Sequence, residues 1–313
     1  MGATIVQASM WAVLTCLAAA ATARWASATP PSPTDLAHCP KLCGDVNITY
    51  PFGIGAGCFR PGFEVTCNDS SRPPKLFLGT TTTEIVDQYP SGVYASIVFN
   101  IATTPGVLTY NRSWESPRKS LNIRPYDNYL VIVGCGIDVY MLNPDTGDVW
   151  GYCSTMCADM AIMRKEADGR ACSGMGCCTI TFQRPVRAFR ISIVQKEETL
   201  PIEVANATLK AFLSYAYDPY QYNFSTADLM SDKIDASTIG NISVFLSTVI
   251  TDQPNCRMAQ LEQKSYACGS NNCVDDDHEN GGYHCTCLIT YFNGGNPYLQ
   301  GGCIQGILLL ISA

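Results

Sequence analysis

The stretch that begins at residue 39 reads Cys39-Pro40-Lys41-Leu42-Cys43-Gly44-Asp45-Val46-Asn47-Ile48-Thr49-Tyr50-Pro51-Phe52-Gly53-Ile54-Gly55. Two further cysteines, Cys58 and Cys67, follow closely, and the chain of 313 residues has 17 cysteines in all. Such a density is typical of exported proteins whose modules are held by disulfide bonds. We therefore expect a mainly β, disulfide-rich fold made of small β modules with short helices.

The N-terminus carries features of a signal peptide. Residues 10–21 are mostly apolar and uncharged, too few to span a bilayer, and small residues follow them. Cleavage is possible after Ala23 or Ala28; we favour Ala28, which makes residues 1–28 the signal peptide. Its removal takes Cys16 away and leaves an even number of cysteines, as complete pairing requires. The alternative is an internal apolar helix in a cytosolic protein.

Other sequence features agree with export. No segment after the leader reaches the roughly 20 apolar residues of a membrane helix, so we expect no membrane span, and the apolar tail 304–313 is too short for a glycolipid-anchor signal. Cys-x-x-Cys pairs are missing and there are only three histidines, so structural zinc is not expected. We expect no cofactor and no nucleic-acid partner. Six glycosylation signals occur, at Asn47, Asn68, Asn111, Asn206, Asn223 and Asn241.

Most of the chain has the composition of short β-strands. Runs rich in Val, Ile, Phe, Tyr and Thr are separated by clusters of Pro, Gly, Asn and Ser. The expected strands cover residues 62–67, 75–78, 93–102, 107–110, 129–133, 139–142, 179–182 and 188–194. Short helices are predicted within 155–167 and 226–234, the second with Ser225 or Thr226 as its N-cap.

Six cysteines near the C-terminus resemble an epidermal-growth-factor-like (EGF-like) module. A single residue separates the fourth from the fifth, and Tyr283 stands two residues before the fourth. Roughly fifty residues cannot bury a sufficient core, so such a module depends on cross-links. The resemblance implies the pairs Cys256–Cys273, Cys268–Cys285 and Cys287–Cys303.

Calcium binding by this module is not expected. The calcium-binding version of the family has an acidic pair just before the first cysteine, and an Asp or Asn five residues before the aromatic. Here Asp252 and Asn255 precede Cys256 without forming that pair, and His278 occupies the second position. No metal site is therefore predicted, and the acidic run 275–277 is interpreted as a solvated loop.

The opening stretch resembles the galacturonan-binding domain of plant wall-associated receptor kinases. The likeness continues through residues 57–58, 62–68 and 73–79, and the run 291–299 looks like that family's version of the EGF-like module. Between them, the cysteines from 135 to 178 look like the associated cysteine-rich region. The resemblance implies a galacturonan-binding-like domain over 36–125, an associated region over 126–250 and an EGF-like module over 251–303.

This resemblance implies an extracellular protein of the plant cell wall, or apoplast, that binds pectin or oligogalacturonides. A polyuronate needs cations for its carboxylates and flat apolar faces for its sugar rings. The whole chain has a net charge of −7, but residues 39–125 contain eight Lys and Arg against six Asp and Glu. An anionic ligand should therefore bind this module more favourably than the rest of the chain. The candidate ligand-binding residues are Lys41, Arg60, Arg72, Lys75, Tyr50 and Phe52.

The residues themselves leave alternatives open. The segment 50–52 could instead be a structural turn packed on disulfides, and the basic residues could serve only solubility. The pairing of the first ten cysteines after the leader also stays open. In the middle region a cysteine that the family often has near Leu213 is missing, so its pairing does not follow from the resemblance. The ten are Cys39, Cys43, Cys58, Cys67, Cys135, Cys153, Cys157, Cys172, Cys177 and Cys178.

No enzymatic activity is expected. The family continues into a membrane helix and a kinase, but no Gly-rich nucleotide loop, His-Arg-Asp or Asp-Phe-Gly follows Cys303. A Gly-x-Ser-x-Gly elbow is also missing, and two of the three histidines lie in the EGF-like module. We therefore expect a kinase-less, secreted, wall-associated receptor-like protein that binds polysaccharide. The alternative is a soluble decoy or partner that binds other extracellular proteins or full-length receptor kinases.

Overall fold

The computed structural model describes residues 30–104, 106–196, 209–217, 221–231, 242–269, 271–276, 281–287 and 295–303. The expected signal peptide, Asn206, Asn241, His278 and the apolar tail lie outside these residues. The described part is mainly β, with three short helices, which confirms the expected fold class. Within it, no helix combines the length and the apolar character that crossing a membrane would require.

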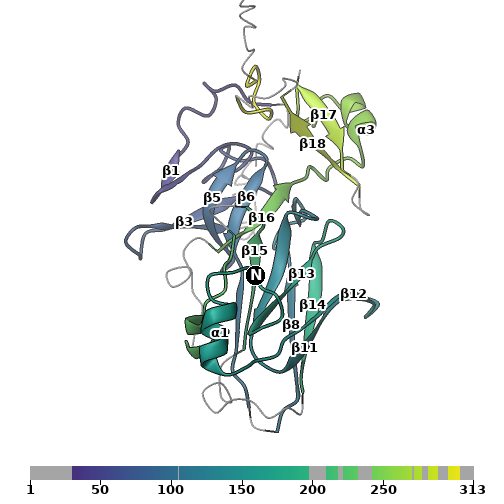
Figure 1. Cartoon of the computed structure of the whole chain (residues 1–313). Coiled ribbons are helices and arrows are strands. Elements are labelled where there is room, and N and C mark those ends of the chain that lie inside the picture. Colours follow the sequence, from purple (N-terminus) through teal and green to yellow (C-terminus); the bar gives the residue numbers. More distant parts are fainter. Residues whose placement is uncertain are drawn as a thin grey trace, which may run out of the picture.

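A six-stranded antiparallel sheet forms the upper body (Figure 1). Its order is β3 (Val65–Asn68), β4 (Lys75–Leu78), β5 (Glu84–Tyr89), β6 (Gly92–Ser96), β16 (Val244–Thr248) and β9 (Leu121–Ile123). The first four strands are consecutive in the chain, whereas β16 comes from far along it and pairs with both β6 and β9. A small ladder of β1 (Leu42–Cys43) and β2 (Val46–Asn47) precedes this sheet.

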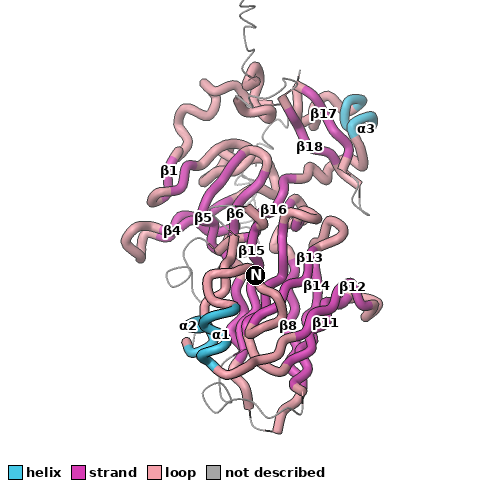
Figure 2. The backbone as a smooth tube through the Cα atoms, viewed as in Figure 1, coloured by secondary structure: helices cyan, strands magenta, loops and turns pink. Residues whose placement is uncertain are grey.

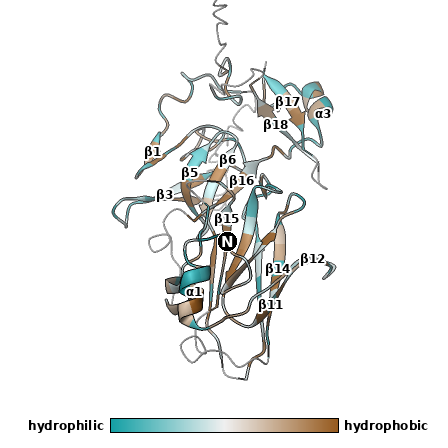
Figure 3. Cartoon of the chain, in the orientation of Figure 1, coloured by the Kyte–Doolittle hydropathy of each residue, from teal (hydrophilic) through white to brown (hydrophobic). Residues whose placement is uncertain are grey.

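Two four-stranded antiparallel sheets form the lower body. One has the order β13 (Cys177–Thr181), β10 (Asn128–Val133), β15 (Leu209–Tyr215) and β7 (Val98–Ile101). The other has the order β12 (Val149–Ser154), β11 (Ile137–Leu142), β14 (Ala188–Gln195) and β8 (Thr109–Glu115). Alternate residues of β11 and β14 are buried, as expected for strands with one face on a core (Figure 3).

Strand β10 is buried on both faces. Leu130 and Ile132 pack into the large core, whereas Val131 and Val133 pack into a second core. That second core lies under α1 (Met160–Glu166) and α2 (Thr226–Met230), which sit together beside the sheet (Figure 2). Both helices fall within the segments predicted to be helical, and both are shorter than those segments.

The C-terminal module contains α3 (Cys256–Leu261) and a hairpin of β17 (Asn272–Asp275) and β18 (Tyr283–Thr286). The sequence did not predict α3. Tyr283 and Tyr298 of this module are fully buried in the same core as both bodies. Backbone bonds between Ile250 and Tyr283, 2.7 and 3.0 Å long, attach the linker to β18.

The expected division at residue 125 does not coincide with a sheet boundary. Strands β7 and β8 precede it in the chain but lie in the lower body, whereas β16 follows it but lies in the upper sheet. One continuous hydrophobic core joins residues of both bodies and the C-terminal module. The first two expected domains therefore exchange strands, whereas the C-terminal module forms a sheet of its own.

Eight disulfide bonds pair all sixteen cysteines after Cys16. Three are the C-terminal pairs that the EGF-like resemblance implies. Two hold the first module and three hold the lower body, where the sequence left the pairing open. These five are Cys39–Cys58, Cys43–Cys67, Cys135–Cys157, Cys153–Cys178 and Cys172–Cys177.

Candidate functional site

The Tyr50-Pro51-Phe52 segment forms a buried turn. Phe52 is 1% exposed, and its ring meets the Phe63 ring edge-on with centroids 5.2 Å apart. The Arg60 backbone N–H donates to the Pro51 carbonyl at 2.9 Å, and the Asn296 side-chain amide donates to the Tyr50 carbonyl at 2.5 Å. The segment therefore forms the structural turn that the sequence left open as an alternative. The Phe52 ring is not accessible to a polymer.

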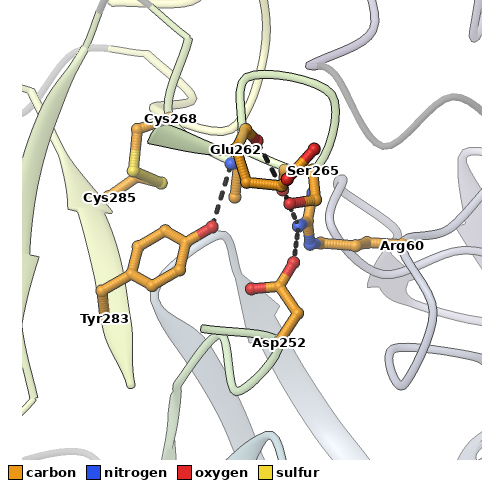
Figure 4. A network of polar contacts seen from close by, with 8 residues as sticks. Arg60, Asp252, Glu262, Ser265, Cys268, Tyr283 and Cys285 are labelled. Carbon is orange, nitrogen blue, oxygen red and sulfur yellow. Dashed lines mark hydrogen bonds and ion pairs between the residues drawn. A yellow bond between two sulfur atoms is a disulfide. The ribbon is translucent and has the colours of Figure 1, made fainter. Parts of the chain in front are cut away.

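Arg60, expected at a polyuronate surface, lies in the interior instead. Its side chain is 5% exposed, and its Nη2 donates to Asp252 Oδ2 at 2.6 Å and to the Ser265 carbonyl at 2.5 Å (Figure 4). Asp252 lies in the linker and Ser265 in the C-terminal module. Arg60 therefore connects the first module to the EGF-like module, and its charge is already opposed by a carboxylate.

Tyr283 makes a separate polar contact within the C-terminal module. Its hydroxyl accepts a hydrogen bond from the Ala267 N–H at 3.1 Å, beside the Cys268–Cys285 disulfide (Figure 4). Burial raises the pKa of Tyr283 to about 12. Burial also raises the pKa of Tyr50, against the opposing effect of the Arg60 guanidinium. Both phenols therefore stay protonated at physiological pH.

The other three candidate cations lie at the surface of the first module. Lys41 is exposed, and its ammonium donates to the Leu36 carbonyl at 2.7 Å. Arg72 is exposed in the turn between β3 and β4. The Lys75 side chain is 46% exposed and lies 3.0 Å from Glu84 Oε2. An ion pair this exposed leaves the ammonium available to a competing carboxylate.

These cations are gathered by the local fold. The Cys43–Cys67 disulfide ties β1 to β3, and Lys75 stands opposite Asn68 in the next strand. Gly44, with φ of +56°, lies against the Pro74 carbonyl, where a Cβ would clash. The β1 segment and the β3–β4 hairpin, which carry these residues, therefore lie on the same side of the upper body (Figure 1).

A hollow of about 460 Å³ opens on the same hairpin. Its wall includes Thr66, Asn68, Phe77, Thr80 and Thr81. Hydroxyl groups beside an aromatic ring suit a sugar better than an apolar ligand. The sequence did not single out this hollow, because its threonines come from two separate segments.

One group in the described part of the chain has the composition of a metal site. His38 Nε2 lies 3.6 Å from Cys39 Sγ and 3.7 Å from Cys58 Sγ. The two sulfurs are bonded to each other, so neither is a thiolate that could bind a metal. This group is therefore a disulfide with a neighbouring histidine.

The glycosylation signals that the structure describes are at the surface. Asn47, Asn68, Asn111 and Asn223 are all exposed. Asn68 also borders the hydroxyl-lined hollow. An attached glycan there would stand next to the candidate site.

Sequence comparisons relate the first module to a known family. Residues 39–89 match the family described as wall-associated receptor kinase galacturonan-binding. The chain is 28% identical over 278 residues to wall-associated receptor kinase 1 of Arabidopsis thaliana, covering 85% of this chain and 34% of that protein. For wall-associated receptor kinase 5 of the same plant the identity is 29% over 276 residues, with the same shares covered.

The chain spans about a third of the length of these curated relatives. Among solved structures, a chain from the infectious bursal disease virus Gt strain covers 56% of this chain and 49% of its own length, at 13% identity. Its TM-score of 0.15 carries no argument about the fold. The sequence matches, in contrast, extend through the lower body and the C-terminal module, and they support a wall-associated receptor ectodomain whose residues 39–89 match the galacturonan-binding family.

Proposed function

We propose that this chain binds pectin outside the cell, at the plant cell wall, through the exposed cations of its first module. The observation that carries the proposal is the family match over residues 39–89, the stretch that holds Lys41, Arg72 and Lys75. De-esterified pectin presents a carboxylate on each galacturonate unit. Lysine and arginine at the surface are the groups that bind such carboxylates.

The binding energy comes from repetition along the polymer. A single exposed ion pair contributes about 0–1 kcal/mol, which is too little for a stable complex with one sugar unit. A polymer that engages several cations on one protein gains affinity through effective concentration. The hollow bordered by Thr66 and Thr80 supplies hydroxyl partners beside these charges.

Two candidates from the sequence are left out of this surface. Arg60 already binds Asp252, and Phe52 is buried against Phe63. Tyr50 is half-buried, and its carbonyl and ring are engaged within the fold. We therefore assign polyuronate contact to Lys41, Arg72 and Lys75.

The test is binding of the full chain to immobilised de-esterified pectin. Charge reversal at all three positions (Lys41→Glu, Arg72→Glu, Lys75→Glu) should weaken binding at least tenfold, and added salt should weaken wild-type binding. The matched control reverses three exposed charges in and after α1 (Arg164→Glu, Lys165→Glu, Arg170→Glu) and should bind like wild type. Equal loss in both triple variants, or binding that ignores salt, would contradict the proposal.

Product analysis in the same assay addresses catalysis. The oligogalacturonide should be recovered with its length unchanged after incubation with the protein. A shortened product would mean that the chain is an enzyme rather than a binding module.

A further inference from the structure

Five aromatic rings form a row where the outer face of the upper sheet meets the end of β15. We call this row the aromatic track; it consists of Tyr89, Tyr94, Tyr215, Tyr217 and Phe245. The ring centroids of Tyr94 lie 6.0 Å from Tyr89, 5.3 Å from Tyr215 and 5.0 Å from Phe245. Tyr217 continues the row, 5.4 Å from Tyr215. Strands β5, β6 and β16, which carry three of these rings, lie side by side in Figure 1.

The track faces away from the hydrophobic core. In β6, Val93 and Ala95 are fully buried, and Tyr94 between them points to the other side of the sheet. Tyr89 is 47% exposed and Tyr217 is 58% exposed. Tyr94 and Tyr215 are partly exposed, whereas Phe245 is only 6% exposed. Exposed aromatic rings mark binding surfaces, and tyrosine offers a flat apolar face with a polar edge.

A cation stands at the Phe245 end of the track. Arg124 directly follows β9, is exposed, and holds its guanidinium carbon 5.4 Å from the centre of the Phe245 ring. A guanidinium that contacts an aromatic face through cation–π attraction can still use its N–H donors for another partner. This is the arrangement that binds a carboxylate through two parallel hydrogen bonds.

Beyond Arg124 the same sheet face enters a crevice of about 360 Å³. The upper sheet supplies Asn122, Arg124 and Ser247, and the C-terminal hairpin supplies Asp275, Asp276 and His284. Asn122 is 2% exposed, and its Oδ1 has no hydrogen-bond partner within the described structure. A buried acceptor without a partner is unfavourable. Because this oxygen is enclosed, it belongs to the polar wall of the crevice and is not a contact point for a ligand.

From these observations we infer that the aromatic track and the adjoining crevice form one binding site for an acidic oligosaccharide. The sugar rings stack on Tyr89, Tyr94 and Tyr217, and the Arg124 guanidinium binds a uronate carboxylate. The carboxylates of Asp275 and Asp276 line the opposite wall, so the ligand's own carboxylate faces Arg124. The ligand class rests on the proposed function, whereas the site is separate from Lys41, Arg72 and Lys75.

Solution titration of oligogalacturonide into the full chain tests this inference. We expect Tyr89→Ala combined with Tyr217→Ala, and separately Arg124→Gln, to weaken binding about tenfold, the loss of roughly one good stacking or charged contact. Both tyrosines are about half exposed, so their truncation leaves the core intact. The matched controls are Tyr152→Ala, an exposed tyrosine of β12, and Arg112→Gln, an exposed arginine of β8, which should both bind like wild type.

The possible results separate this inference from the proposed function. If the track variants bind like wild type while the triple charge reversal in the first module abolishes binding, the inference is wrong and the proposed function stands. In that case the track is a surface for another class of partner, such as a protein. If wild type binds no oligogalacturonide in solution but is retained on immobilised pectin, the inference is wrong and the proposed function stands. Loss of binding in the track variants alone would support the inference.

Discussion

Arg60 Nη2 lies 2.6 Å from Asp252 Oδ2, although 192 residues separate the two in the chain. Asp252 stands just before the first cysteine of the EGF-like module, the region where calcium-binding versions of such modules place acidic ligands. Here a guanidinium from another module occupies that carboxylate. The contact fixes the start of the C-terminal module against the first module.

Removing Asp252 should therefore destabilise the protein strongly. The Arg60 side chain is 5% exposed, so Asp252→Ala leaves a buried cation without its carboxylate, and we expect a loss of about 3 kcal/mol. Glu84→Ala breaks the exposed pair with Lys75 and should cost about 0–1 kcal/mol. Urea unfolding with the disulfides intact measures both. Equal losses would show that the Arg60 pair is no stronger than a surface pair.

The disulfides of the lower body should differ in their contribution according to loop length. Cys153–Cys178 closes a separation of 25 residues and Cys172–Cys177 one of 5. Loop-closure entropy then predicts losses of about 3.5 and about 2 kcal/mol when each pair is replaced by alanines. Thermal unfolding of the two double variants provides the comparison. The reverse order would mean that packing at the cysteines, rather than loop length, decides their contribution.

Stability should fall at acidic pH because of His284. Burial lowers the pKa of His284 below 6.5; the Asp276 carboxylate opposes this shift and the Arg124 guanidinium adds to it. The unfolded chain therefore binds a proton below pH 6.5 that the folded chain does not. The contribution of neutral His284 to the free energy of unfolding is complete above pH 6.5. It is lost as the pH falls through the pKa that His284 has in the folded protein.

Unfolding midpoints at pH 7.5, 6 and 5 should show this effect. His284→Gln should lose less stability on acidification than wild type, and the exposed His38→Gln is the control variant. If His284→Gln and wild type fall in parallel, His284 does not cause the pH dependence.

The N-cap of α2 should stabilise the second core. The Ser225 side chain accepts from the backbone N–H groups of Ala227 and Asp228, and the Asp228 carboxylate accepts from the Ser225 N–H, which completes a capping box. Ser225→Ala should cost about 1 kcal/mol. Because Ser225 is also part of the glycosylation signal of Asn223, the matched control is Asn223→Gln, which removes the glycan and keeps the cap. The contribution of the cap is the difference between the free energies of unfolding of the two variants, measured by chemical unfolding. Equal free energies would show that the cap does not stabilise the protein.

The sequence correctly predicted strands and a helix whose residue patterns lie within a few positions of one another. The run 75–78 coincides with β4, the run 188–194 lies within β14, and Ser225 begins α2 as expected. The sequence missed β9 and β16, which are short and exist because they pair with each other and with β6. Such long-range pairing leaves no periodic signal within a few residues of the chain.

The candidate site was predictable to a similar extent. The prediction that Lys41 and Arg72 lie at the surface is correct. Charged side chains remain in water unless a partner compensates for their burial. Arg60 has such a partner in Asp252, and nothing near residue 60 reveals it. The crevice around Asn122 was also missed, since its walls come from the upper sheet and the C-terminal hairpin.

The position of β16 between β6 and β9 bears on biosynthesis and on experimental dissection. A ribosome-bound chain that has emerged only as far as residue 243 still lacks the strand that joins β6 to β9. Until then β6 has an open edge, which is a template for pairing with other chains. A recombinant fragment cut at residue 125 would keep that edge permanently. The segment that matches the galacturonan-binding family is thus best expressed together with everything through Thr248.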